Sequence, residues 1–390
     1  MYQFEDCQVN PRRFELRRGG EVVHVEPQVF TLLAHLIEHR DRVVAKTELL
    51  DAVWGDRYVS DSALTSRVKM LRRAVGDDGT RQRVIATVHG IGYRFVAEVT
   101  ESSRSAEVVD RPAQRIRYCE SADGVHVAYA LSGTGTPLVK AANWLTHLDL
   151  EWSSPIWAHW LDGLARHHRL VRYDERGCGL SDWNVPDLSF DAWVDDLELV
   201  VDAAGLDTFP LLGVSQGGAV AIAYAARHPE RVTGLVLVGA YCRGRLARAT
   251  TDAEREEAAL DLQLARIGWR HDDPSFRQVF ASQFLPDGSR TLWDAFNDLQ
   301  RATTSTENVL RFLEEFARID VSSLAPRVRC PTLILHSRGD LRVPRAQARE
   351  LAALIPDSEL RFLNSRNHIL TAGEPAWPAF LTEVDRFLAA

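Results

Sequence analysis

The sequence predicts an α/β protein of two domains: a mostly parallel sheet covered by helices and, before it, a smaller α+β domain. Apolar runs of strand length alternate with helical runs from residue 115 onward, which is typical of a parallel sheet. Residues 1–98 combine short strands with amphipathic helices instead. A chain of 390 residues also exceeds the usual size of one small domain.

Composition narrows the class of protein. The chain is 45% hydrophobic and 26% charged, as globular proteins are. Its net charge of −8 argues against a general affinity for nucleic acid, although residues 1–98 carry 15 Lys and Arg against 14 Asp and Glu. No apolar run has bilayer length, and the first residues lack a secretion signal. The five cysteines are scattered, which is typical of a protein in the reducing cytoplasm and does not indicate a metal site. We therefore expect a cytoplasmic protein with no membrane contact, metal or cofactor.

The first domain is expected to open with a small antiparallel sheet. Residues 2–25 alternate loosely between apolar and polar around a turn at residues 18–21. A helix is expected after Glu26-Pro27, where apolar side chains recur on one face. A second helix is expected over residues 46–54, and Gly55 would end it.

The third helix of this domain, from Asp61 or Ser62 to Val75, is predicted to be amphipathic. Its apolar residues fall on one narrow seam, and the opposite face is basic. A basic helix face is more often plain solvated surface than a binding site. Residues 84–96, however, read as two strands joined by a glycine-containing turn, so a β-hairpin should stand directly beside this helix.

This order of sheet, three helices and hairpin resembles the OmpR/PhoB-type winged helix, more narrowly the form found in CadC-like regulators. The resemblance rests on V-V-A-K-T-E-L-L-D-A-V-W-G, V-S-D-S-A-L-T-S-R-V-K-M-L-R-R-A-V-G-D and T-V-H-G-I-G-Y-R-F, which together span most of residues 1–98. It implies that the third helix enters the major groove of promoter DNA while the hairpin, the wing, touches the backbone or minor groove. The contacts it implies are Ser66, Arg67, Lys69, Arg73 and His89.

The sequence departs from this family in two places, and its domain order differs as well. Ala45 stands where a capping Ser or Thr is usual, and His89 replaces the commoner wing arginine. The family's winged helices usually act as phosphorelay-type effector domains behind a receiver domain. This chain starts with the winged helix, so we do not expect phosphorylation to be its input.

Residues 99–114 are polar and non-periodic and are expected to form a linker. The second domain then spans residues 115–390. Its strands are predicted at residues 116–120, 125–132, 137–142, 169–173, 209–214, 232–238, 332–336 and 359–363. The chemistry of such a sheet is expected at the carboxyl ends of its strands.

One of these ends carries the motif around which the domain is organised, F-P-L-L-G-V-S-Q-G-G-A-V, with Ser215 at its centre. A side chain at so sharp a strand-to-helix turn is strained, and Gly213 and Gly217 avoid the clashes. The five-residue pattern alone arises by chance, so the strand before it and the helix after it give it weight. This nucleophile elbow resembles that of the α/β-hydrolase superfamily. The resemblance implies the α/β hydrolase fold, a mostly parallel sheet with a helical cap.

The remaining residues of the candidate site follow the same logic. Asp340 follows the strand 332–336 and His368 follows the strand 359–363, which gives the chain order that this fold requires. His368 would take the proton of Ser215, and Asp340 would hold the imidazole. The amides of Gln216 and Trp144 would form the oxyanion hole, although Ala-Asn-Trp replaces the superfamily's commoner His-Gly there.

Two further features bear on the ligand. The loop Y-D-E-R-G-C-G-L-S-D resembles the superfamily's D-x-R-G-x-G-x-S loop, and we interpret it as structural, with Arg176 pairing locally. Residues 241–324 interrupt the sheet pattern with charged helices and are expected to form the cap. The aromatic side chains of the cap are more often core than ligand wall. A tryptophan group begins in the oxyanion loop and favours an apolar or aromatic small molecule: Trp144, Trp152, Trp157 and Trp160.

Three functions remain open from the sequence. The first is a transcriptional regulator whose hydrolase-like domain binds, and also cleaves, a small apolar ester, lactone or amide. The second is a serine esterase with the winged helix as a tether. The third is a catalytically silent receptor that controls DNA binding. Because winged helices often work in pairs, a homodimer is a further expectation.

Overall fold

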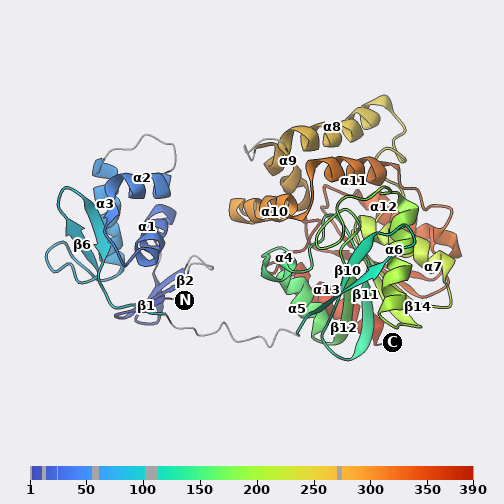
Figure 1. The fold of residues 1–390 in the computed structure, drawn as a ribbon, viewed down its shortest axis with the longest axis horizontal. Helices are drawn as coiled ribbons and strands as arrows, with labels where there is room; N and C mark the ends of the chain where they lie inside the picture. Colours follow the sequence, from blue (N-terminus) through green and yellow to red (C-terminus); the bar gives the residue numbers. More distant parts are fainter. Residues whose placement is uncertain are drawn as a thin grey trace. The chain divides into compact units, whose positions relative to one another are not determined.

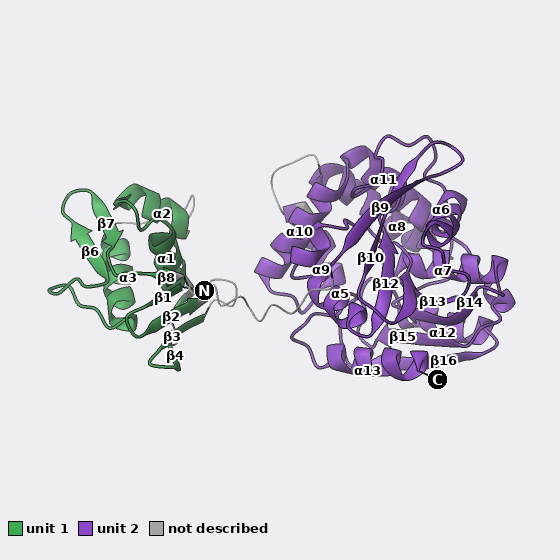
Figure 2. Cartoon of the chain, turned by 60° about the horizontal axis from the view of Figure 1, so that its bottom comes forward, with its two compact units in different colours: residues 1–110 green, residues 111–390 purple. Residues whose placement is uncertain are grey.

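The computed structural model describes residues 2–10, 15–23, 25–54, 61–101, 113–269 and 275–389. Contacts between Cα atoms divide the chain into two compact units, residues 1–110 and 111–390 (Figure 2). Most of the segment expected to be a linker lies outside the described residues. The first residues of that segment are described: Thr100 and Glu101 form a strand that pairs with Tyr2 and Gln3. The N-terminal sheet therefore extends past residue 98.

The N-terminal unit opens with a five-stranded antiparallel sheet in the order β4-β3-β2-β1-β8. Its strands are β1 (Tyr2–Phe4), β2 (Cys7–Asn10), β3 (Glu15–Arg18), β4 (Glu21–Val23) and β8 (Thr100–Glu101). The predicted turn at residues 18–21 joins β3 to β4, and Gly19 and Gly20 both take positive φ angles there (58° and 87°). That conformation is easy only for glycine.

Three helices and a second sheet complete this unit (Figure 1). The helices are α1 (Pro27–Glu38), α2 (Lys46–Trp54) and α3 (Asp61–Ala74), and the sheet β5-β7-β6 consists of β5 (Val44–Ala45), β6 (Ile85–Val88) and β7 (Gly92–Phe95). The predicted seam of α3 is confirmed, because Leu64, Val68, Leu71 and Val75 are all buried in the core of this unit. Ala45 has no side-chain oxygen to cap α2. The Ile91 carbonyl in the β6–β7 turn partly fills this role, because it accepts the Lys46 amide.

The hairpin β6–β7 is fixed to α3 by polar side chains. The Asp77 carboxylate accepts the backbone amides of Arg83, Val84 and Ile85 at 2.9–3.0 Å. Arg72 donates to the Ile85 carbonyl, at 2.7 Å from Nη2. Arg72 therefore serves to hold the hairpin against the helix.

The C-terminal unit is built on an eight-stranded sheet in the order β16-β15-β14-β13-β11-β12-β10-β9. All strand pairs from β16 to β12 are parallel, and β10 and β9 pair antiparallel at one edge. The mostly parallel sheet predicted from the sequence is confirmed, each strand lying within two residues of its expected bounds. The strands are β9 (Arg115–Glu120), β10 (His126–Ser132), β11 (Thr136–Lys140), β12 (His168–Tyr173), β13 (Phe209–Val214), β14 (Val232–Val238), β15 (Thr332–Ser337) and β16 (Ser358–Leu363).

Helices alternate with these strands. They are α4 (Leu150–Ser153), α5 (Ala158–Ala165), α6 (Phe190–Ala203), α7 (Gln216–Arg227), α12 (Arg345–Leu354) and α13 (Ala376–Leu388), with a short 3₁₀ turn at Ala325–Arg327. Between β14 and β15 the chain forms four more helices, in the segment expected to be the cap: α8 (Asp252–Gly268), α9 (Ser275–Phe284), α10 (Arg290–Thr303) and α11 (Thr306–Arg318). Figure 1 shows these four gathered on one side of the unit. No helix among the described residues combines the length and apolar character that crossing a bilayer requires.

One sequence interpretation needs correction. Arg176 was expected to pair locally, but its guanidinium binds Asp196, 20 residues away on α6, at 2.7 Å through two nitrogens. A third nitrogen lies 2.8 Å from Asp123. The Asp196 side chain is fully buried, so Arg176 joins the loop after β12 to the interior of the unit.

Candidate functional sites

Ser215 lies at the turn between β13 and α7 with a strained backbone. Its φ of 54° and ψ of −125° are unusual for a residue with a side chain. Neighbouring glycines make room for this turn: a Cβ on Gly213 would lie 2.5 Å from the Gly218 Cα, and one on Gly217 would lie 2.4 Å from the Ala142 carbonyl oxygen. The strain is thus held in place by backbone packed closely on both sides of the serine.

His368 and Asp340 extend from Ser215 in a hydrogen-bonded row. The Ser215 hydroxyl lies 2.9 Å from His368 Nε2, and His368 Nδ1 lies 2.7 Å from the Asp340 carboxylate. The imidazole is buried and packs near Gly239, where a Cβ would come within 3.0 Å of the ring. The His368 amide donates to the Phe284 carbonyl of α9 at 2.8 Å, so the cap holds the histidine loop.

The second oxygen of Asp340 is occupied by the loop after β15. It accepts the backbone amides of Arg342 and Val343 at 2.8 and 2.9 Å. Burial alone would raise the pKa of this carboxyl, but the charge and hydrogen bond of His368, with the Val343 amide, hold the pKa below its ordinary value. Asp340 is therefore ionised and fixed beside the imidazole.

Gln216 and Trp144, whose amides were expected to bind an oxyanion, line one pocket with Ser215. Gln216 is the first residue of α7, and its side chain donates to Glu175 at 2.5 Å. The Trp144 indole donates to Gln300 of α10 at 2.8 Å. In the loop after β11 the left-handed conformation falls on Leu145 (φ 49°) and not on Asn143. Asn143 therefore does not need the backbone freedom of glycine.

Glu175 is buried behind Gln216, and this predicts a pH effect on stability. Burial, only partly opposed by the Gln216 hydrogen bond, raises its pKa from 4.5 to about 8. The folded state therefore holds a proton that the unfolded state releases above pH 4.5, so stability falls as the pH rises toward 8. Glu175→Gln keeps an acceptor for Gln216 and removes this titration. Its melting temperature should fall less than that of the wild type between about pH 5 and pH 8.

The comparison is made by thermal unfolding across that pH range. Glu256→Gln, at an exposed site on α8, is the matched control and should retain the wild-type slope. Buried Asp174, whose pKa burial raises to about 7, leaves a residual slope in every variant. Equal slopes for Glu175→Gln and the wild type would contradict the prediction.

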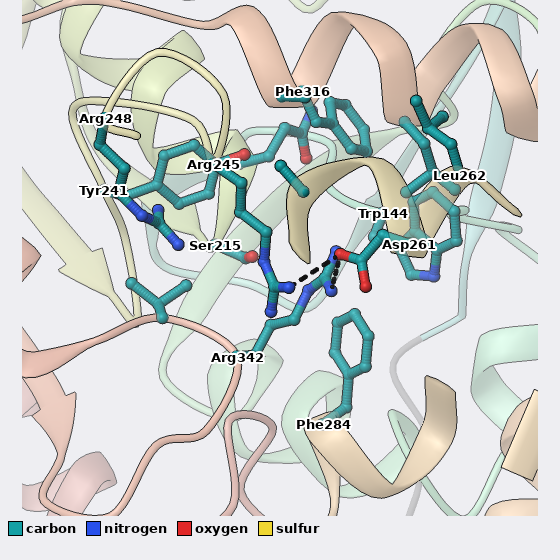
Figure 3. Close-up of a pocket in the computed structure, with 15 residues that line it drawn as sticks. Trp144, Ser215, Tyr241, Arg245, Arg248, Asp261, Leu262, Phe284, Phe316 and Arg342 are labelled. Atoms are coloured by element: carbon teal, nitrogen blue, oxygen red, sulfur yellow. Dashed lines mark hydrogen bonds and ion pairs between the residues drawn. The ribbon is translucent and has the colours of Figure 1, made fainter. Parts of the chain in front are cut away.

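The pocket beside Ser215 has a volume of about 600 Å³, including its open mouth, and lies under the cap (Figure 3). Its walls come from the loops after β11, β13, β14 and β15 and from cap helices α8, α9 and α11. They consist of Trp144, Ser215, Gln216, Tyr241, Arg245, Arg248, Ala258, Asp261, Leu262, Phe284, Leu313, Phe316, Ala317, Arg342 and Val343.

The tryptophan group predicted from the sequence does not form a ligand wall. Only its first member, Trp144, lines this pocket. Trp157 and Trp160 are buried, and Trp160 packs on Trp377 of α13 with ring centroids 5.2 Å apart. Trp152 lies against the Arg172 guanidinium. Of this group, only Trp144 therefore bears on the predicted apolar or aromatic ligand.

Sequence reasoning missed the charged residues of the pocket. Arg245 and Arg248 lie in the segment R-G-R-L-A-R that follows β14, and Arg342 comes two residues after Asp340. Both positions follow the carboxyl ends of parallel strands, where ligands bind in such sheets. That placement was the signal that could have identified them.

In the N-terminal unit, the predicted DNA-contacting residues divide into two groups. Ser66, Lys69 and Arg73 on α3 are exposed, and so is His89 in the turn between β6 and β7. Arg67 is half-buried and turned toward α1, where its Nε donates to Gln28 at 3.0 Å. Three of the four α3 residues thus share one open face.

Three described residues at the C-terminal end of α1 and on α2 have atoms that could hold a metal ion: His35, His39 and Glu48. Each of the three already has a protein partner. His35 Nε2 lies 3.0 Å from Glu48, His39 Nδ1 lies 2.9 Å from the His35 carbonyl, and Glu48 also binds Arg42 at 2.6 Å. The arrangement fits an ion-paired contact between two helices.

Comparisons with known proteins match both units. Residues 146–371 match the family model for the alpha/beta hydrolase fold, and residues 20–95 match the model named transcriptional regulatory protein, C terminal. A pyrrolizixenacetamide deacetylase from Xenorhabdus hominickii is 28% identical over 246 residues, which cover 61% of this chain and 86% of that protein.

Solved structures also match the α/β hydrolase fold of the C-terminal unit. The esterase RhEst1 from Rhodococcus sp. ECU1013 is 27% identical with a TM-score of 0.56, covering 70% of this chain and 98% of that one. The enol-lactonase from Burkholderia xenovorans LB400 is 23% identical with a TM-score of 0.55, covering 70% of this chain and all of that one. At that identity the enol-lactonase supports the fold alone.

Proposed function

Because this chain belongs to the α/β-hydrolase fold family and carries a transcriptional regulatory domain at its N-terminal end, we propose that it is a ligand-dependent regulator of transcription. Its C-terminal unit binds and hydrolyses a small carboxylic ester, lactone or amide. The observation that carries this proposal is the row of hydrogen bonds from Ser215 through His368 to Asp340, with Ser215 lining a pocket under the cap. The deacetylase and esterase named above favour this substrate class.

The geometry suggests the following chemistry. As the Ser215 Oγ bonds to the substrate carbonyl carbon, its proton passes to His368 Nε2, 2.9 Å away. The carbonyl oxygen becomes an oxyanion, which the amides of Gln216 and Trp144 would bind. His368 then gives the proton to the leaving group as the acyl bond breaks. Water repeats the sequence on the acyl-serine and releases the acid, while Asp340 stabilises the imidazolium at each step.

A fluorophosphonate probe tests the hydrolase half directly. Such a probe reacts with serines that an adjacent base activates, so we expect one adduct per chain, and peptide mapping should place it on Ser215. Heat-denatured protein is the control and should stay unlabelled. A folded protein that takes up no probe would favour the silent receptor over the enzyme.

The regulatory half is proposed to act through the exposed face of α3. Ser66, Lys69 and Arg73 would meet DNA together with His89 of the wing, and Arg67 would join them from the edge of the face. Ligand binding under the cap would change the affinity of this face for its promoter, directly or through a homodimer. We also propose that the winged helix is of the CadC-like subtype. The alternative is a serine esterase on which the winged helix serves as a tether.

We expect Lys69→Ala and Arg73→Ala each to weaken binding to the gene's upstream DNA by about 10-fold and to reduce the slope of log affinity against log salt by about 1. Each variant loses one contact that releases counterions from the DNA. Arg17→Ala is the matched control, because Arg17 lies on β3 and pairs with Glu15. Gel shifts at several salt concentrations give both quantities. Unchanged slopes in both α3 variants would reject this face as the DNA-binding surface.

A further inference from the structure

The pocket beside Ser215 contains three arginines and a single carboxylate. Arg245 and Arg248 come from the segment after β14, Arg342 comes from the loop after β15, and Asp261 comes from α8. Figure 3 shows the guanidinium groups of Arg245 and Arg342 close to each other, both joined to Asp261, with Arg248 beside Tyr241. The walls of the pocket are therefore more cationic than anionic.

The one carboxylate is shared by two of the arginines. The same oxygen of Asp261 lies 2.7 Å from Arg342 and 3.1 Å from Arg245. The two guanidinium groups also donate to one neutral oxygen, that of Gln283, at 3.0 and 3.1 Å. This second contact satisfies hydrogen bonds without balancing any charge.

Arg248 has no carboxylate of its own in the part of the chain that the structure describes. Its Nη1 donates to the Arg243 carbonyl at 3.1 Å. The Arg248 side chain is half-buried, and the carboxylate that raises its pKa is again Asp261. Among the residues that line the pocket, three arginines therefore stand against one carboxylate, and Glu257, which does not line it, acts only weakly on Arg245.

This excess of positive charge has an energetic cost. Burial, with the charge of Arg342 as the next cause, lowers the pKa of Arg245 to about 10, and burial also lowers that of Arg248. Buried charges in proteins are normally paired, because an unpaired one loses its hydration without a replacement. A ligand that brings an anionic group into the pocket would supply the missing partner.

Arg342 is held in a fixed orientation relative to the reacting groups. Its guanidinium carbon lies 5.1 Å from the ring centre of Phe280 and 5.0 Å from that of Phe284. Its backbone amide donates to the oxygen of Asp340 that His368 leaves free. Arg342 is therefore joined to the Ser215–His368–Asp340 row through the loop after β15.

We propose that Arg245, Arg248 and Arg342 form a subsite for a carboxylate, so that the substrate is an ester, lactone or amide that also carries a carboxylate on an apolar body. Asp261 shows that a carboxylate fits between two of these guanidinium groups. Planar, two-pronged donors of this kind match carboxylate geometry. Apolar walls remain for the rest of the molecule, from Trp144, Leu262, Leu313 and Phe316. This inference rests on the proposed function, since both use the pocket into which Ser215 opens.

Binding of a matched pair of probes tests the subsite without any turnover. Phenylacetate and phenylacetamide have nearly the same shape, and only the first carries a negative charge. Calorimetric titration of the full wild-type chain should give phenylacetate at least about 10-fold tighter binding, because charge-assisted hydrogen bonds are roughly twice as strong as neutral ones. Arg248→Met should remove this preference, whereas Arg255→Met, an exposed arginine of α8 paired with Asp252, should keep it.

A second comparison separates this proposal from the proposed hydrolysis. The 4-nitrophenyl monoester of glutaric acid should be cleaved with at least about 10-fold higher kcat/KM than neutral 4-nitrophenyl butyrate, and Arg248→Met should lower only the former. Phenylacetate preference without cleavage of either ester would overturn the hydrolysis and support the subsite. Cleavage of both esters at equal kcat/KM, with equal binding of the two probes, would support the hydrolysis and overturn the subsite. Because the probe pair is measured on wild-type protein, a variant that fails to fold does not remove the test.

Discussion

Replacing Ser215 by alanine is expected to lower kcat for ester hydrolysis by at least about 10³-fold and to leave the affinity for the intact ester within about threefold. The hydroxyl supplies the bond-forming oxygen, so no other group of the row can replace it. The proposed oxyanion donors and the arginines are untouched by the change, which is why binding should persist. Stopped-flow or steady-state release of 4-nitrophenolate gives kcat, and calorimetry gives the affinity.

Ser282→Ala is the matched control for this variant. Ser282 belongs to cap helix α9, where its hydroxyl donates to the Val279 carbonyl, and it does not line the pocket. Its kcat should equal that of the wild type. Equal hydrolysis by Ser215→Ala and the wild type would reject Ser215 as the nucleophile.

The same variant separates sensing from turnover. If the intact ester changes the DNA affinity of Ser215→Ala, occupation of the pocket is the signal. If only the wild type responds, the released acid or the acyl-serine is the signal. Either result retains the proposed link between the two units. If the ester leaves the DNA affinity of both proteins unchanged, the esterase with a tethered winged helix is favoured.

The sequence predicted the framework of both units because their patterns are local. A strand of the parallel sheet is a short apolar run, as in residues 209–214, and α3 shows its buried seam through the spacing of Leu64, Val68 and Leu71. The Ser215 turn was predictable for the same reason, since Gly213 and Gly217 lie within two residues of it. Local chemistry and close steric limits leave a clear trace in a single sequence.

What the sequence did not reveal depends on contacts between distant segments. Trp157 and Trp144 are both aromatic and buried, yet only Trp144 reaches the pocket, because periodicity identifies a buried side chain without identifying its neighbours. The three arginines of the pocket come from two loops about 100 residues apart. Their combined charge exists only after folding brings those loops under the cap.

The ion pair between Arg176 and Asp196 is a further long-range feature. Removing the arginine should destabilise the C-terminal unit strongly. Arg176→Met leaves Asp196 buried at a fully covered site with no counter-charge, which costs about 3–5 kcal/mol of unfolding free energy. The pKa of Asp196 is already raised by burial even with Arg176 present, and removing the arginine raises it further. Since the folded state then favours the protonated acid, stability should fall more steeply as the pH rises above 3.8, the ordinary pKa of this carboxyl.

Urea unfolding followed by tryptophan fluorescence measures this loss, because every tryptophan except Trp54 lies in the C-terminal unit. The double variant Arg176→Met/Asp196→Leu removes both buried charges and should recover most of the loss, as replaced buried ion pairs often do. Arg227→Met is the matched control: Arg227 also binds two aspartates, Asp191 and Asp195, but all three side chains are open to solvent and the expected change is below about 1 kcal/mol. A loss in Arg176→Met no larger than in Arg227→Met would mean that water or local rearrangement hydrates Asp196. In that case the loop after β12 would be held by its backbone hydrogen bonds and not by the ion pair.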